Sequence, residues 1–376
     1  MAEIRYESLL VEQALSREYA AELDRALKSM DGLNDIKPLI RDFEKVFADY
    51  IGVKNALAVN SGSDALKMAL LAGGVKPGDE VIVPDLTYQA VALAVFYCGA
   101  KPVPVDARGD DLQIDAALLK AAITKKTKAV IAAHMFGRPC DIEAIARICR
   151  DNKVLFIEDV CQAESSRYQG RMLGSFGDLA TFSFSYYKPL SSCGGGGGMV
   201  IGNNEKADHI RHWMEDWRND EELLKTGQRF APMSFMDLIA LRVKFAHLKE
   251  IIKSRQKIKE LYEDGLGSVS GLTIYKDQYQ TESVPQNFVI SCSQRDELAE
   301  FLTSQGTMVQ KPYLPLHQMS VFKGIMKNKF PVSESYSKTA LHLPLHSFMS
   351  QDKAMKVIDQ CRSFLSKKIK YTTSKG

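Results

Sequence analysis

Short apolar segments alternate with amphipathic stretches of helical periodicity through the first half of the chain. Continuous apolar strands separated by amphipathic helices are typical of a mostly parallel sheet that is covered by helices on both faces. The predicted fold class is therefore α/β. The expected strands lie at residues 55–59, 80–83, 129–133 and 154–157, and the expected helices at 64–71, 88–97 and 142–151.

The second half of the chain has a different pattern. One long helix is predicted over residues 236–263, followed by a strand at 287–290 and helices at 295–304 and 351–365. A length of 376 residues corresponds to two domains at about 150 residues each. We predict a large domain over residues 1–263, which includes an N-terminal helical segment and the long connecting helix, and a smaller C-terminal α+β domain over residues 264–376.

Charge and cysteine usage exclude several classes of protein. The 49 Lys and Arg residues nearly balance 46 Asp and Glu residues, so a dedicated nucleic-acid binder is not expected. No apolar segment approaches the roughly 20 residues of a membrane span, and residues 1–31 lack the apolar core of a signal peptide. The seven cysteines are scattered without a C-x-x-C pair, and the histidines lack ligand spacing. These features predict a cytoplasmic protein with no disulfide framework and no metal site.

Ligands of parallel α/β sheets bind at the carboxyl ends of the strands, where two groups of residues are candidates. Ser61, Gly62 and Ser63 lie between a strand and a helix, and free N–H groups at a helix start form an anion site. An ordinary helix cap is the alternative. Glu158 and Asp159 lie at the end of the strand expected at residues 154–157, where a carboxylate could bind a cationic ligand group or cap a neighbouring turn.

Lys188 follows an aromatic and serine-rich segment, residues 181–187, whose alternation predicts a half-buried strand. Most lysines are solvated. Five glycines at 194–198 follow, however, and such a run lets the backbone pass close to a bulky group. A lysine in a partly desolvated pocket loses its proton more easily and can form a Schiff base.

These features together match the requirements of pyridoxal phosphate. The phosphate needs an anion site, and the flat ring needs a stacking partner such as Tyr88. The ring nitrogen needs an anion that keeps it protonated, and the aldehyde needs a lysine.

The chain resembles the DegT/StrS family of sugar aminotransferases, which are fold-type I pyridoxal-phosphate enzymes. The resemblance covers nearly the whole chain. It is carried by residues 43–53, 59–66, 78–84 with Thr87 and Tyr88, 98–103, 134–139, 157–162, 182–184 with Lys188, 315–317 and 343–346.

The resemblance implies a role for each matching position. Lys188 would form the Schiff base and shuttle the proton, and Asp159 would face the ring nitrogen. His317 falls in a substrate-side motif, where a structural role is equally plausible. The other implied cofactor contacts are Gly62, Ser63 and Ser183 at the phosphate, Tyr88 against the ring, and Gln162 near the phenolic oxygen.

The implied function is transfer of an amino group from an amino acid, expected to be glutamate, to a keto-sugar that is most simply nucleotide-linked. A homodimer with a shared active site is implied as well. The alternatives are a keto-cyclitol or unactivated sugar phosphate as acceptor, and a non-catalytic regulatory protein that keeps the fold.

Two features of the sequence leave alternatives open. The family usually has an asparagine that reaches the partner's phosphate, whereas residues 231–236 contain none; Ser234 is a possible substitute. Seven basic residues crowd the long helix, where a solvated face is the simpler interpretation and a phosphate contact the alternative. They are Arg242, Lys244, Lys249, Lys253, Arg255, Lys257 and Lys259.

Overall fold

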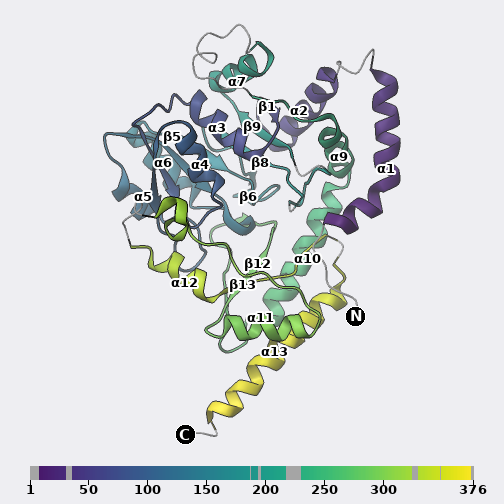
Figure 1. The fold of residues 1–376 in the computed structure, drawn as a ribbon, viewed down its shortest axis with the longest axis vertical. Coiled ribbons are helices and arrows are strands. Elements are labelled where there is room, and N and C mark those ends of the chain that lie inside the picture. Colours follow the sequence, from purple (N-terminus) through teal and green to yellow (C-terminus); the bar gives the residue numbers. More distant parts are fainter. Residues whose placement is uncertain are drawn as a thin grey trace.

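A computed structural model of the chain describes residues 8–30, 36–186, 188–193, 196–216, 230–323, 329–347 and 349–373. A seven-stranded sheet forms the centre of its larger part (Figure 1). Strand β9 is antiparallel to both of its neighbours, and the other adjacent pairs are parallel. The predicted mostly parallel sheet is confirmed. In spatial order the strands are β1 (Asn55–Val59), β9 (Gly198–Gly202), β8 (Leu179–Ser183), β5 (Leu155–Asp159), β4 (Thr127–Ala133), β2 (Glu80–Pro84) and β3 (Lys101–Val105).

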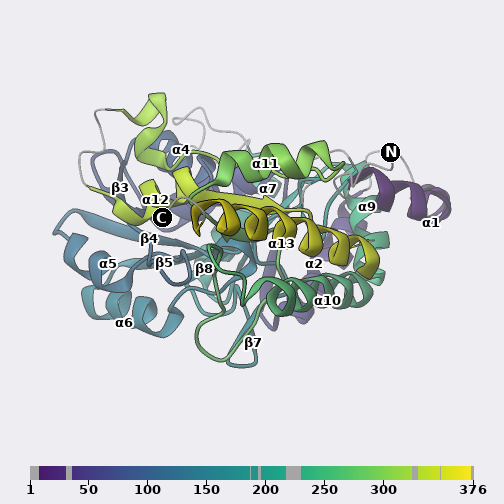
Figure 2. The same ribbon diagram turned by 90° about the horizontal axis from the view of Figure 1, so that it is seen from below.

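Helices cover both faces of this sheet. Successive strand residues point to opposite sides, so the apolar strands place side chains that need burial on each face. Ala58 packs in one buried core and its neighbour Val59 in the other. Figure 2 shows α4 and α6 on opposite sides of the strands. The first core is closed by α2 (Lys37–Ile51), α5 (Ala116–Ala122), α6 (Ile142–Asn152) and α9 (Phe235–Ala246), and the second by α3 (Gly62–Ala72), α4 (Ala90–Tyr97) and α7 (Glu205–Asp216).

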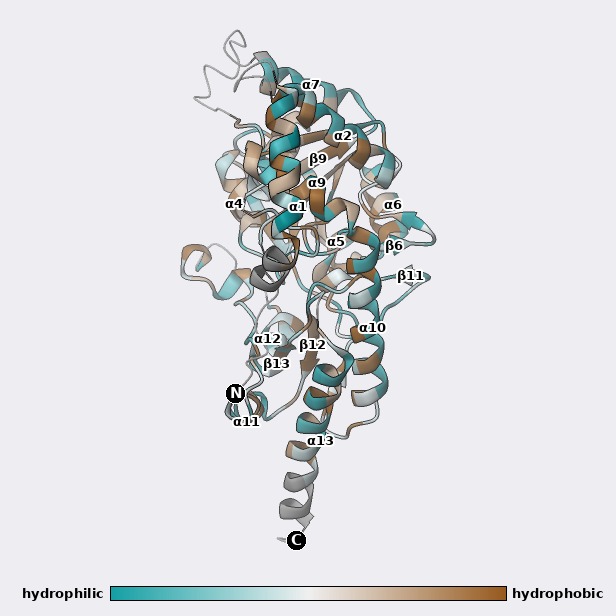
Figure 3. Ribbon diagram, turned by 90° about the vertical axis from the view of Figure 1, so that its right-hand side faces the viewer, coloured by the Kyte–Doolittle hydropathy of each residue, from teal (hydrophilic) through white to brown (hydrophobic). Residues whose placement is uncertain are grey.

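A smaller three-stranded antiparallel sheet lies in the C-terminal part. Its central strand is apolar and lies among helices that carry polar residues on their outer sides (Figure 3). The predicted helix over residues 295–304 is confirmed at both ends. The elements here are β10 (Thr273–Ile274), β12 (Phe288–Ser291), β13 (Ala340–Leu343), α10 (Leu248–Leu266), α11 (Arg295–Ser304), α12 (Pro331–Thr339) and α13 (Gln351–Thr373).

Helix α10 links the two parts (Figure 1). Leu248 at its start packs in a core of the large sheet, whereas Ile258 and Leu266 pack in the core of the smaller part. The expected boundary at 263/264 thus falls within this helix, and the division of the chain at that point stays a prediction.

The prediction of one continuous helix over residues 236–263 is wrong. The chain leaves helical geometry at His247, whose ψ is 9°, so that α9 ends and α10 begins there. His247 Nε2 lies 2.7 Å from Glu18 Oε2 on the N-terminal helix α1 (Ser8–Ser29). The apolar stripe continues through His247 because both helices need a buried face. Helix α9 packs against the large sheet, whereas most of α10 packs in the core of the smaller part.

Part of the C-terminal half, residues 275–287, contacts the larger part of the molecule and is called the arm here. Its strand β11 (Thr281–Glu282) pairs with β6 (Arg167–Tyr168), which pairs in turn with β7 (Arg171–Met172). Among the described residues no helix combines the length and hydrophobicity that a bilayer span requires. The remaining elements are single 3₁₀ turns, η1 (Met135–Gly137), η3 (Leu316–Gln318) and η4 (Ser320–Phe322).

Candidate active site

A cleft of about 580 Å³ opens at the carboxyl ends of the strands of the large sheet. Loops after β1, β2, β4, β5 and β8 line its floor and sides, and residues 286–287 and 310–313 from the C-terminal half close it. Seven of the eight sequence-predicted site residues line this cleft. They are Gly62, Ser63, Tyr88, Asp159, Gln162, Ser183 and Lys188.

The start of α3 forms one end of the cleft. Ser61 caps the helix, since its Oγ accepts the N–H of Asp64 at 3.1 Å, and the cap and the anion site therefore coexist. A Cβ at Gly62 would lie 2.6 Å from Ser183 Cβ, so glycine is needed for α3 to approach the end of β8. This close approach brings the Ser183 side chain next to the first turn of α3.

The glycine run is explained by the same turn. A Cβ at Gly198 would lie 2.5 Å from the carbonyl carbon of Ser61, and one at Gly196 would lie 2.8 Å from Asp237 Oδ2. Residues 194 and 195 of the run lie outside the described residues. The bulky group that the sequence predicted beside these glycines is therefore, at Gly198, the backbone of the strand-to-helix turn.

The two adjacent carboxylates at the end of β5 have different surroundings. Glu158 is fully buried outside the cleft and accepts the N–H groups of Gly174, Phe176 and Gly177 at 2.6–2.9 Å. Asp159 lines the cleft, and its Oδ1 accepts the N–H of Cys161 at 3.0 Å. Because neighbouring strand residues point to opposite sides, only one of the pair can face a ligand.

Lys188 lies in the cleft, but not directly after a strand. Strand β8 ends at Ser183 and is buried on both sides, so the predicted half-buried strand over residues 181–187 is wrong; Tyr187 lies outside the described residues. The strand ends early because Phe184 turns into the core of the large sheet. Lys188 Nζ donates to Gln286 Oε1 at 3.3 Å.

Tyr88 and Gln162 meet at a residue that the sequence analysis missed, Tyr313. The Tyr88 ring is 54% exposed and contacts the Tyr313 ring edge-on, with centroids 6.4 Å apart. Gln162 Nε2 donates to the Tyr313 hydroxyl at 3.3 Å, and Gln162 Oε1 accepts the N–H of Phe136 at 3.2 Å. Burial raises the pKa of the Tyr313 hydroxyl, so the group stays protonated at neutral pH.

Gln286 and Tyr313 both come from the C-terminal half, which is why sequence reasoning did not find them. Neither follows a strand of the large sheet, and which loops cover the cleft depends on how the two parts pack. The only available signal was the proline-rich stretch at 312–315, which is typical of a rigid loop but does not indicate its place.

His317 is the one predicted site residue that does not line the cleft. Its backbone N–H and its Nδ1 both contact the buried carboxylate of Asp85, at 3.0 and 2.7 Å. Asp85 directly follows β2, in the loop that leads to Tyr88. This geometry fits the structural alternative, in which His317 supports the loop that carries Tyr88.

The basic residues of the two helices do not form a single face. Lys244 and Arg255 are fully buried, and Lys244 Nζ donates to Ser191 Oγ at 2.7 Å. The simpler interpretation of a solvated face is therefore wrong for these two positions. Their cationic groups lie at helix–loop contacts, where buried backbone and hydroxyl oxygens need donors.

The residues of the cleft fit pyridoxal phosphate. The approach of α3 to Ser183 that Gly62 allows leaves helix N–H groups and two serine hydroxyls for a phosphate. A carboxylate, an exposed aromatic ring and a lysine amine complete the set that the ring and aldehyde require.

A mostly parallel sheet with such a cleft at its carboxyl edge is the architecture of fold-type I pyridoxal-phosphate enzymes. The sequence model of the DegT/DnrJ/EryC1/StrS aminotransferase family matches residues 13–362, and the chain belongs to that family. It is accordingly an aminotransferase, and aminotransferases of this family depend on pyridoxal phosphate. The family, fold class, enzyme class and cofactor predicted from the sequence are confirmed.

Relatives of known name match over nearly their full length. The dTDP-3-amino-3,4,6-trideoxy-alpha-D-glucose transaminase of Streptomyces venezuelae is 33% identical over 358 residues, which cover 94% of each chain. The GDP-perosamine synthase of Caulobacter vibrioides is 32% identical over 354 residues, 90% of this chain and 95% of that protein. The crystal structure of S. venezuelae DesV in complex with a ketimine intermediate superimposes with a TM-score of 0.90 at 30% identity, covering 97% and 99% of the two chains.

Proposed function

We propose that the enzyme moves an amino group from an amino acid, expected to be glutamate, to a nucleotide-linked keto-sugar. The observation that carries the proposal is the placement of Lys188 and Asp159 in one cleft beside the start of α3. The names of both relatives above contain a nucleotide-linked sugar, one with dTDP and one with GDP. These names support a nucleotide-linked acceptor over a keto-cyclitol or an unactivated sugar phosphate.

The cleft residues divide the work of holding the cofactor. Gly62, Ser63 and Ser183 would hold the phosphate, and Tyr88 would stack on the ring. Asp159 would hold a proton at the ring nitrogen. Gln162 would lie near the phenolic oxygen, in the position that its bond to Tyr313 fixes.

Lys188 would do the proton transfer. When bound, pyridoxal phosphate supplies a carbonyl that takes up the amino group and a ring that accepts electrons. Lys188 Nζ would take the proton from the α-carbon of the amino acid and later return one to the sugar carbon that gains the amino group. An amine acts as a general base through the lone pair of its nitrogen.

Incubation of the purified enzyme with glutamate alone tests this function. The absorbance of the bound cofactor should change from the pyridoxal to the pyridoxamine form, with one 2-oxoglutarate released per active site. Borohydride should attach the cofactor irreversibly to Lys188 in the untreated enzyme, and Lys188→Ala should abolish both results. If glutamate, glutamine, alanine and aspartate all leave the spectrum unchanged, the proposal is wrong and a non-catalytic role is favoured.

A panel of acceptors tests the substrate class. With enzyme in the pyridoxamine form, a nucleotide-linked keto-sugar should restore the pyridoxal spectrum at a lower concentration than the matching free keto-sugar, keto-cyclitol or sugar phosphate. A preference for one of the latter compounds would contradict the nucleotide-linked acceptor while leaving the aminotransferase assignment intact.

We also propose that the enzyme works as a homodimer in the cytoplasm. None of its seven cysteines, all of them among the described residues, forms a disulfide, and five of them are buried, which fits a reducing compartment. The segment 231–236, which matches the part of the family pattern that reaches the partner subunit, lies beside the turn between β1 and α3, with Asn60 N donating to Ala231 O at 3.1 Å.

A further inference from the structure

We propose that Gln286 positions the amine of Lys188 and that Arg255 fixes Gln286 in place. The proposal rests on the function above, in which Lys188 is the reacting group. Gln286 contributes the only hydrogen bond to Lys188 Nζ among the described residues, at 3.3 Å from Oε1. Both side chains line the cleft and both are half-buried.

In the hydrogen bond between Lys188 and Gln286, the lysine is the donor. The carbonyl oxygen of a glutamine side chain can only accept, so it binds an N–H of the lysine. An amine held by one N–H keeps its lone pair on another side of the nitrogen, where it is available to a substrate. Gln286 would thereby orient Lys188 whenever the lysine is not bonded to the cofactor, which is the state in which it moves the proton.

Arg255 holds the backbone on which Gln286 sits. It lies on α10 and is fully buried. Its Nη1 donates to the carbonyl oxygens of Pro285 and Gln286, at 2.7 and 3.1 Å, and its Nε donates to Ser347 Oγ at 3.3 Å. Burial lowers the pKa of this guanidinium to about 9. A buried cation is costly unless its hydrogen bonds are made, so these contacts fix two successive carbonyl groups firmly.

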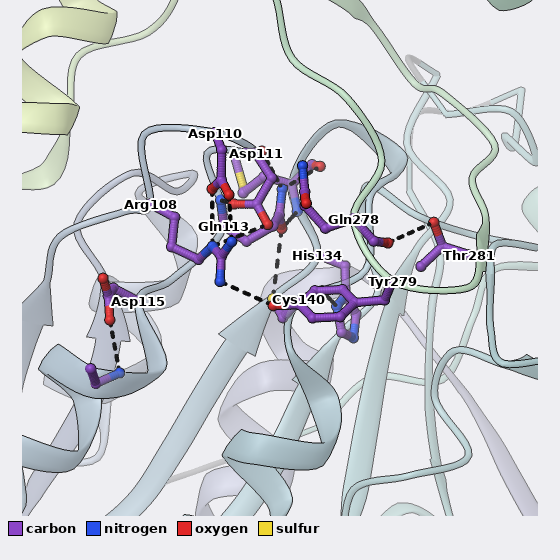
Figure 4. A network of polar contacts seen from close by, with 12 residues as sticks. Arg108, Asp110, Asp111, Gln113, Asp115, His134, Cys140, Gln278, Tyr279 and Thr281 are labelled. Carbon is purple, nitrogen blue, oxygen red and sulfur yellow. Dashed lines mark hydrogen bonds and ion pairs between the residues drawn. The ribbon is translucent and has the colours of Figure 1, made fainter.

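The arm that contains Gln286 makes further contacts with the larger part of the molecule. Val284 N donates to Ser166 Oγ at 2.9 Å, and a Cβ at Gly137 would clash with the Val284 carbonyl oxygen. Farther along the arm, Arg108 Nη1 donates to the Tyr279 hydroxyl at 3.1 Å, within the polar network of Figure 4. The arm therefore delivers Gln286 from the C-terminal half to a fixed place in the cleft.

Chemical labelling of Lys188 tests the contact without the reaction. In the full-length protein freed of cofactor, acetylation of Lys188 is followed against pH by mass spectrometry. Gln286→Glu places an anion at the contact and should raise the pH midpoint of labelling by about one unit or more. The matched control is Gln310→Glu, the same change in the same cleft at a residue whose backbone, and not its side chain, makes the hydrogen bonds found for it. Equal shifts in the two variants would overturn the proposal.

Two further variants separate positioning from folding. Gln286→Leu should lower the labelling midpoint and reduce kcat of the holoenzyme by roughly 10- to 100-fold, with the KM for the amino donor little changed. Arg255→Met should reproduce both effects, and Arg255→Lys should give intermediate values. If Arg255→Met does not fold, the Gln286 variants alone decide. An unchanged kcat in Gln286→Leu would contradict the proposal, whereas borohydride attachment to a different lysine in the wild type would contradict the proposed function instead.

Discussion

At the scale of single residues, the neighbouring carboxylates of β5 lie on opposite sides of the strand. Asp159 lines the cleft, and Glu158 accepts backbone hydrogen bonds outside it. We expect Asp159→Asn to reduce kcat by about 10²–10³-fold with little change in Tm, because an amide cannot hold a proton at the ring nitrogen. Glu158→Gln is the matched control on the other side of the strand. The substitution should lower the stability by about 1.5–3 kcal/mol, since the Glu158 carboxylate accepts three backbone N–H groups. It should leave the kcat of the folded enzyme nearly unchanged. The reverse pattern would exchange their roles.

Glu164 predicts a dependence of stability on pH. It is 2% exposed, neither carboxylate oxygen has a hydrogen-bond partner among the described residues, and burial raises its pKa to about 8 against the opposing charge of Lys188. Between pH 4.5 and about 8 the folded state therefore holds a proton that the unfolded state releases. Stability should fall as pH rises through this window, by at most about 1.4 kcal/mol per pH unit from this group.

The variant Glu164→Gln cannot ionise and should remove that part of the pH dependence. Its Tm relative to the wild type is expected to increase between pH 5 and pH 8. Glu300→Gln makes the same change at an exposed position and should give a difference that is flat with pH. Parallel Tm curves for wild type and Glu164→Gln would show that Glu164 is ionised in the folded protein.

At the scale of secondary-structure elements, the sequence predicted β1, β2, β4 and β5 of the large sheet because these strands are continuous apolar runs, whereas β3 and β9 were not predicted and β8 was given wrong bounds. Residues at the ends of those strands or just after them, such as Asp159 and Gly62, could be identified for the same reason. The helix break at His247 could not be predicted, since the apolar stripe continues across it while the buried faces belong to two different cores. Gln286 and Tyr313 were equally hidden, because their place in the cleft depends on contacts between distant parts of the chain.

Two helix caps of the same type provide a test at this scale. Ser61 caps α3 and Ser234 caps α9, each accepting an N–H from the aspartate three residues later. Ser234 Oγ also donates to Asp237 Oδ2 at 2.7 Å, so its hydroxyl is already used within its own chain. We therefore expect the backbone of this segment, and not the hydroxyl, to serve the partner's phosphate site.

Alanine at either cap should cost about 1 kcal/mol of stability. Only Ser61→Ala should also weaken retention of the cofactor, because α3 begins at the proposed phosphate site. Cofactor release under dilution, followed by absorbance, measures this difference. Loss of cofactor from Ser234→Ala as large as that from Ser61→Ala would indicate that the Ser234 hydroxyl crosses the interface after all.

At the scale of the whole molecule, large side chains in and near the cleft are exposed in the single chain. Tyr88 and Tyr186 line the cleft with 54% and 43% of their surface exposed, and Met236, the last residue of the segment 231–236, is 54% exposed. Exposed aromatic and methionine side chains are enriched in protein interfaces. Since the segment 231–236 also contacts the strand-to-helix turn at Asn60, we expect a second chain at this place to complete the proposed phosphate site.

The holoenzyme should therefore sediment as a dimer at micromolar concentration and lose cofactor when it is diluted into monomers. A C2 dimer uses the same patch on both chains, so a charge introduced by one substitution enters the interface from each of the two chains. Met236→Glu should shift the equilibrium towards monomer and lower cofactor occupancy with it. Met355→Glu, at an exposed methionine on α13 in the other part of the molecule, is the control and should change neither. A monomer that keeps full activity and bound cofactor would refute the shared active site.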